Sequence, residues 1–256
     1  MSLTSSAPQP SLAWQFESSN VDSVVGLAPS SSTIDGSLTS APTYVSGEYG
    51  QAVYFNNQNA SFTGNANSYI RYNLTTFGFS SNSATVSCWI NPSYTFPLAS
   101  GNNPFYLNLL TGTTTAYYSF QSNADSNVSF VTGTSPTITI KNPAQTGVWN
   151  HYCAVFSNVG TTGASNTASY FYVNGTLVGS GNTSSQAFGS LNLGAFNNAS
   201  ANKPAWCSID DLRLFNTALT STQIQSIYNA QGMPNQVSLS GSGTTSMRGV
   251  GTIKFQ

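Results

Sequence analysis

Charged side chains are scarce in this sequence of 256 residues. Asp, Glu, Lys and Arg together make up 5% of it, against about 25% in ordinary soluble domains. The cationic residues are scattered between Arg71 and Lys254 and form no basic patch, which argues against nucleic-acid binding and against binding to an anionic membrane surface. Ser, Thr, Asn, Gln and Gly must therefore provide the wetted surface. Such surfaces are common where a protein packs against neighbours or faces sugars.

Histidine, cysteine and long apolar runs are also rare. The only histidine is His151, and the three cysteines, Cys88, Cys153 and Cys207, form no CxxC pair, so a zinc site is disfavoured. Their odd number favours three reduced, buried thiols, with a Cys88–Cys153 disulfide as the alternative. No apolar run reaches the roughly 18 residues of a membrane span. The opening residues 1–10 lack the basic and apolar regions of a secretory signal.

What the sequence does contain is a series of short apolar runs separated by Gly, Asn, Ser and Pro clusters, a pattern typical of β-strands. The predicted strands are Leu12–Phe16, Gln51–Phe55, Tyr69–Leu74, Ala84–Ile90, Phe105–Leu110, Ala116–Gln121, Val128–Val131, Thr137–Ile140, Trp149–Phe156, Ser169–Val173, Thr176–Val178, Ser190–Gly194 and Ile209–Phe215. Within 84–90, Val86, Cys88 and Ile90 share one face. The dipeptide Asn174-Gly175 lies between two apolar runs and predicts a type I′ hairpin turn.

A single helix is predicted, over about 220–231. Thr220 and Gln223 have the spacing of a capping box, and Leu219 and Ile224 that of a hydrophobic staple. Gly232 is placed to end the helix.

Many strands and one helix indicate an all-β fold, a two-sheet antiparallel β-sandwich or jelly roll. The composition divides the chain into a polar N-terminal segment over 1–13, the sandwich over 14–232 and a Gly/Ser-rich C-terminal arm over 233–256. This arm is expected to be either a linker or a segment that pairs with a neighbour's sheet edge.

Several of these runs, in order, resemble the laminin-G-like, concanavalin A-like lectin/glucanase superfamily. The matching segments are Trp14-Gln-Phe with Asp22-Ser, and the stretches 47–55, 68–71, 84–92, 147–154, 172–179 and 209–220. The resemblance covers about residues 14–232 and implies a concanavalin A-like jelly roll with one short C-terminal helix. A less specific similarity, in the stretch 227–234 and the low charge, is to sandwich domains in structural proteins of large DNA viruses of algae.

The sequence predicts no catalytic residues. Glycosidases of the superfamily carry two carboxylates on one strand, spaced E-x-D-x-E, whereas the only glutamates here, Glu17 and Glu48, have no partner at that spacing. Asp210 and Asp211 are adjacent, and strand alternation would turn them to opposite faces. His151 matches a structural strand position of the family, which favours a core histidine over a catalytic one. The chain is therefore not expected to be an enzyme.

The resemblance also implies a metal and leaves room for a sugar site. Family members often hold one calcium ion, and the matching residues are Asp22 and Asp210, with Glu17 as a further candidate. The alternative is that Asp210 caps backbone amides in a tight corner. No other cofactor is required. Among the aromatic residues that could stack on a sugar ring, Trp206 and Tyr117 are the candidate ligand-binding residues; Trp206 follows a polar loop.

Two functions are compatible with these features. The first is a non-catalytic structural or interaction module, a minor capsid or surface component of a virus particle that packs against neighbouring structural proteins. The alternative is a carbohydrate-binding, lectin-like module of a secreted or cell-surface protein, whose partners are glycans. Neither function involves nucleic acid or a membrane span.

Overall fold

The computed structural model describes residues 8–19, 21, 23–28, 42–57, 68–95, 98, 103–111, 116–122, 127–132, 139–143, 145–158, 166–184, 186–196 and 203–230. These residues form two antiparallel sheets and one helix, which confirms the predicted β-sandwich. Asp22, residues 1–7 and the arm over 233–256 lie outside the described residues. The predicted division of the chain into three segments therefore stays a prediction.

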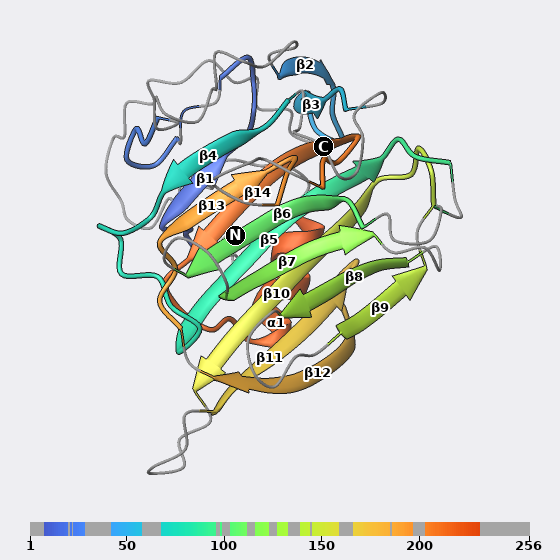
Figure 1. Cartoon of the computed structure of the whole chain (residues 1–256). Helices are drawn as coiled ribbons and strands as arrows, with labels where there is room; N and C mark the ends of the chain where they lie inside the picture. Colours follow the sequence, from blue (N-terminus) through green and yellow to red (C-terminus); the bar gives the residue numbers. More distant parts are fainter. Residues whose placement is uncertain are drawn as a thin grey trace, which may run out of the picture.

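Sheet A has eight strands, in the order β12-β11-β10-β5-β14-β3-β2, with β1 paired to β14. Their bounds are β1 Leu12–Trp14, β2 Thr43–Ser46, β3 Gln51–Phe55, β5 Ser83–Pro92, β10 Asn150–Asn158, β11 Asn166–Val173, β12 Thr176–Ser184 and β14 Cys207–Phe215. Sheet B has six strands, in the order β4-β13-β6-β7-β8-β9. Their bounds are β4 Ile70–Asn73, β6 Phe105–Thr111, β7 Ala116–Ser122, β8 Asn127–Thr132, β9 Thr139–Pro143 and β13 Ser190–Leu193. Figure 1 shows the two sheets stacked face to face.

The core lies between the sheets and is rich in aromatic side chains. Alternation along β5 sends Val86, Cys88 and Ile90 into it, as predicted. Aromatic pairs connect the two sheets: the rings of Trp14 and Tyr72 are 4.6 Å apart, and those of Tyr118 and Phe156 are 4.9 Å apart. Such pairs add about 0.5–1.5 kcal/mol each beyond the area that they bury.

Helix α1 (Ser221–Asn229) covers part of the outer face of sheet A, which is the face turned away from sheet B (Figure 1). Both hydrogen bonds of the predicted capping box between Thr220 and Gln223 are present. The helix packs Ile224 and Ile227 against a second apolar cluster that includes Cys153, Val155 and Phe215. Among the described residues, no helix has the length and apolar character that crossing a membrane requires.

The hairpin and the cysteines also agree with the predictions. Asn174 and Gly175 have φ angles of 49° and 76°, as a type I′ turn requires, and they join β11 to β12. All three cysteines are free and buried. A Cys88–Cys153 disulfide is excluded by the register, because Cys88 lies opposite Tyr152 and Cys153 opposite Ser87, on the other face of the sheet.

Candidate functional site

The middle of the outer face of sheet A holds a polar cluster of Ser87, His151, Asp211 and Arg213. These residues come from β5, β10 and β14, which are neighbours in the sheet. Ser87 and His151 lie in the strand phase opposite to the core residues, so their side chains point away from sheet B. All four residues are buried, although they face outward.

Ser87 and His151 form a hydrogen bond of 2.7 Å between Oγ and Nε2. Each residue is only 1% exposed. Burial, together with the positive charge of Arg213, lowers the pKa of His151 to about 3. Its Nδ1 atom has no hydrogen-bond partner in the described part of the chain.

Asp211 is engaged elsewhere. Both of its carboxylate oxygens accept hydrogen bonds of 2.7 Å from the guanidinium of Arg213. A bulge lies between Asp210 and Arg213, and Asp211 has a φ angle of 46°. The bulge breaks the alternation that predicted opposite faces for Asp210 and Asp211, and it turns Asp211 toward Arg213. Asp211 therefore does not orient His151, which a Ser-His-Asp triad would require.

Aromatic rings seal the polar cluster. Trp89 stacks on Tyr228 of helix α1 at 5.7 Å, meets Tyr49 edge-on at 5.6 Å and lies 5.4 Å from the ring of His151. Tyr49 belongs to the turn between β2 and β3, so two separate elements close over one tryptophan. The Ser87–His151 pair is thus buried under these rings, and in the described part of the chain no carboxylate orients the histidine.

Asp210 and Glu17, two of the three candidate metal ligands, both hold the turn between β2 and β3. The Oδ2 and Oδ1 atoms of Asp210 accept from the amides of Tyr49 (2.9 Å) and Asp211 (2.6 Å). Glu17 accepts from the amide of Gln51 at 3.0 Å. A Cβ atom at Gly47 would lie 2.5 Å from Asp210, so this turn fits around the carboxylate only with glycine there.

This arrangement matches the amide-capping alternative for Asp210. Burial raises the pKa of its carboxyl to about 7 and the nearby Asp211 and Glu17 add to the rise, while the two amide donors oppose it. The described residues contain no group of three His, Cys, Asp or Glu side chains that could hold a metal ion. Asp22 lies outside the described residues, so calcium binding through Asp22 and Asp210 stays a prediction.

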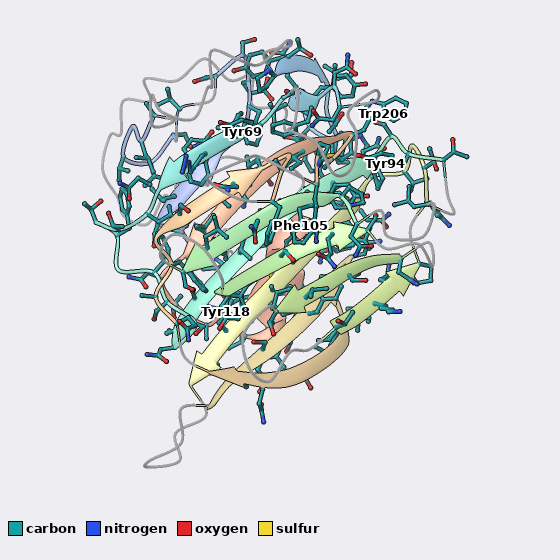
Figure 2. The ribbon with its side chains drawn as sticks, viewed as in Figure 1. Tyr69, Tyr94, Phe105, Tyr118 and Trp206 are labelled. Atoms are coloured by element: carbon teal, nitrogen blue, oxygen red, sulfur yellow. The ribbon has the colours of Figure 1, made fainter. Side chains whose placement is uncertain are left out.

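Trp206 lies at one end of the sandwich, next to Tyr94 (Figure 2). Its ring meets that of Tyr94 edge-on at 5.9 Å, and its indole N–H donates to the hydroxyl of Tyr54 at 2.5 Å. The Tyr94 hydroxyl accepts from the Trp206 amide and donates to the carbonyl of Pro204, both at 2.7 Å. These contacts fix the indole in one orientation while leaving it partly exposed.

A row of polar side chains runs from this tryptophan across four strands. In register, Asn91 of β5 faces Ser208 of β14, Ser208 faces Tyr54 of β3, and Tyr54 faces Thr43 of β2. Their neighbours in sequence point into the core, so these four point outward. We call the set Trp206, Tyr94, Tyr54, Asn91 and Ser208 the aromatic end. None of its members is charged.

The outcome for the other aromatic candidate is different. The side chain of Tyr117 on β7 lies outside the described residues, so its predicted ligand role stays a prediction.

Tyr54 and Asn91 were not predicted from the sequence, although one signal in it could have found them. Each occupies the outward phase of a strand whose apolar residues alternate inward.

On the outer face of sheet B, the polar side chains in the middle of the described strands are buried. One row of its outward side chains consists of Asn192 of β13, Asn108 of β6 and Ser119 of β7, and all three are buried. The side-chain amides of Asn108 and Asn192 both donate to the carbonyl of Phe196. At the aromatic end, by contrast, Trp206, Tyr54 and Asn91 are partly exposed, while Tyr94 and Ser208 are buried.

Comparison with known proteins decides the family. A sequence model described as the concanavalin A-like lectin/glucanases superfamily matches residues 62–225, which is more than half of the chain. The chain belongs to this superfamily. The match confirms the resemblance drawn from the sequence motifs. No curated protein matches the sequence of this chain significantly.

Solved structures agree on the fold. Domain 4 of AbnA, an extracellular arabinanase from Geobacillus stearothermophilus solved with arabinotriose, is 21% identical with a TM-score of 0.61, and the match covers 86% of this chain and 98% of that one. The binding domain of Paraclostridial Mosquitocidal Protein 1 is 14% identical with a TM-score of 0.61, and that of botulinum neurotoxin serotype G is 13% identical with a TM-score of 0.60. The chain spans 51% of each toxin binding domain, over 86% and 87% of its own length. At these identities the likeness shows the fold alone.

Proposed function

We propose that this chain is a non-catalytic module that binds a neutral carbohydrate at the aromatic end. The observation that carries the proposal is the partly exposed indole of Trp206, held in place by Tyr54 and Tyr94 beside a row of amide and hydroxyl groups. A fixed aromatic face next to a few polar groups is the usual composition of a small-ligand site.

The chemistry of the row suits sugar hydroxyls. Asn91 provides an amide that can donate and accept, and Tyr54 provides a partly exposed hydroxyl, while Ser208 between them is buried. Because the aromatic end carries no charge, a uronic or sulfated sugar would find no ion-pair partner in it. The AbnA domain, which has the same fold over almost its whole length, was solved with a neutral trisaccharide, and this supports the choice of ligand class.

The proposal also accounts for the sealed polar cluster. Ser87 and His151 are the only pair in the described part of the chain that resembles a nucleophile and its base, and both are buried beneath Trp89. Binding without catalysis leaves this cluster as an internal support for the sheet. Such a module would work outside the cell or on its surface, where glycans are exposed.

The test is a neutral glycan array, with arabinotriose as one probe, followed by calorimetric titration of any ligand found. Trp206→Ala should abolish binding, and Asn91→Ala should weaken it at least tenfold, since a lost hydrogen bond to a ligand costs about 1.5 kcal/mol. Asn82→Ala is the matched control, because Asn82 is an exposed amide just before the opposite end of β5. Thermal unfolding of each variant checks that it is folded.

Two results would refute the proposal. One is a wild-type chain that binds no neutral glycan on the array. The other is binding that survives both Trp206→Ala and Asn91→Ala unchanged, which would place the ligand elsewhere on the molecule.

A second proposed function is that of a minor structural component of a virus particle. The observation in its favour is the low content of charge, 13 charged residues in 256 when the 6 basic and 7 acidic residues are added. Burying a charged side chain in an interface costs more than burying an uncharged polar one. This role predicts that the chain co-purifies with a particle from its native source, and recovery only as a free protein would contradict it.

A further inference from the structure

The strand β12 is an edge of sheet A that no other described strand covers. It has one strand neighbour in its sheet, β11, and none on its other side among the described residues. Its residues from Thr176 to Val178 are exposed, and so are Ser180 and Asn182. Leu177 is 49% exposed and Val178 is 37% exposed, which puts them among the most exposed large apolar side chains of the described structure.

Protected edges in this sandwich show what β12 lacks. Edge strands are commonly protected by being short or by carrying charge or proline. The edge strands β2 and β4 have 4 residues each, and β4 carries Arg71. The edge strand β9 has 5 residues and carries Lys141 and Pro143. Among the described strands with a single strand neighbour, β12 is the longest, with 9 residues, and it contains neither charge nor proline.

The edge is also regular and held in place. A bulge near Val178 interrupts its pairing, but the six residues from Gly179 to Ser184 pair in unbroken register with β11. On the core side, Ile140 of β9 packs against Gly179 so closely that a Cβ atom there would lie 2.6 Å from its Cγ2. The opposite sheet thus supports β12 from within, while no strand in the described part of the chain pairs with its outer edge.

We infer that β12 pairs with β12 of a second copy of this chain, in antiparallel orientation about a two-fold axis. In such a contact each residue meets a residue of the same strand, and a charge near the axis would be repelled by its own copy. β12 has no charge to be repelled, and it also has none with which to recognise an acidic or basic partner. Pairing joins the two eight-stranded sheets into one and covers Leu177 and Val178 of each copy at the two ends of the contact. This inference does not depend on carbohydrate binding, because the aromatic end lies on β5, β14 and β3, away from the β12 edge of sheet A.

The experiment measures the mass of the intact chain in solution, by light scattering and sedimentation, from micromolar to hundreds of micromolar protein. The wild type should be a dimer that dissociates on dilution. Ser180 lies at the middle of β12, so Ser180→Lys places like charges next to the axis, whereas Val178→Lys replaces an apolar side chain by a charge at each end of the contact. Each should raise the dissociation constant at least tenfold. Both side chains are exposed, so the fold should tolerate the change, which circular dichroism checks.

Ser46→Lys is the matched control, because Ser46 is an exposed residue of β2, the other edge of the same sheet. It should leave the dissociation constant unchanged. A wild-type chain that is monomeric throughout the concentration range overturns the inference. So does a dimer that both β12 lysine variants leave intact, or one that Ser46→Lys disrupts to the same extent.

Discussion

His151 and Asp210 give the stability of this protein two opposing dependences on pH. His151 is the only histidine of the chain, and both residues are 1% exposed on the outer side of sheet A. Burial lowers the pKa of His151 from its ordinary 6.5 to about 3 and raises that of Asp210 from 3.8 to about 7. In the folded chain, His151 therefore binds a proton less readily than in the unfolded chain, and Asp210 loses its proton less readily.

A fall in pH changes the free energy of unfolding in opposite directions through the two groups. As the pH falls below 6.5, the unfolded chain binds a proton at His151 before the folded chain does, so stability is lost until about pH 3. As the pH falls below 7, the folded chain binds a proton at Asp210 before the unfolded chain does, so stability is gained until about pH 3.8. Between pH 7 and 5, each effect amounts to about 2 kcal/mol, since one pKa unit corresponds to about 1.4 kcal/mol.

The wild type should therefore have nearly constant stability between pH 5 and 7, whereas two variants should not. His151→Gln removes the first effect, so its free energy of unfolding should rise by about 2 kcal/mol as the pH falls from 7 to 5. Asp210→Asn removes the second, so its free energy of unfolding should fall by a similar amount.

Urea unfolding at a series of pH values measures these slopes, and NMR of the single histidine measures its pKa directly. Each variant will also be less stable overall, because it loses hydrogen bonds, but the slope with pH is separate from that offset. Parallel profiles for the wild type and both variants would refute the argument. A histidine resonance that titrates near pH 6.5 in the folded protein would show that the polar cluster is open to water.

Two further predictions concern Asn57 and the metal. Asn57 is buried and donates to the carbonyls of Ser68, Gly194 and Ala205, so Asn57→Ala should lower the free energy of unfolding by about 3 kcal/mol. Asn56→Ala, at the exposed neighbouring position, should change it by less than about 0.5 kcal/mol, and equal losses for the two variants in urea unfolding would contradict the prediction. For calcium, EDTA should lower the unfolding temperature of protein prepared with the ion, and Asp22→Ala should abolish that effect; an unfolding temperature that EDTA leaves unchanged removes the metal prediction.

Most of the fold could be predicted because its signals are local. The alternation in β5, the type I′ turn at Asn174-Gly175 and the capping box at Thr220 each reflect backbone geometry within a few residues. β2 was missed because Thr43–Ser46 is a short edge strand with no clear alternation of burial. The bulge at Asp211 was missed because nothing in the sequence of β14 interrupts its strand pattern.

The sequence by itself determined that this chain is a sandwich with an uncharged, polar surface, and it indicated Trp206 through the polar loop before it. Only the tertiary structure decided what surrounds that tryptophan, because Tyr54 lies 152 positions away and reaches it through the pairing of β3 with β14. The open edge at β12 is likewise a property of strand order. Strand periodicity arises from neighbouring residues along the chain, whereas strand order arises from contacts between distant segments, which no local pattern encodes.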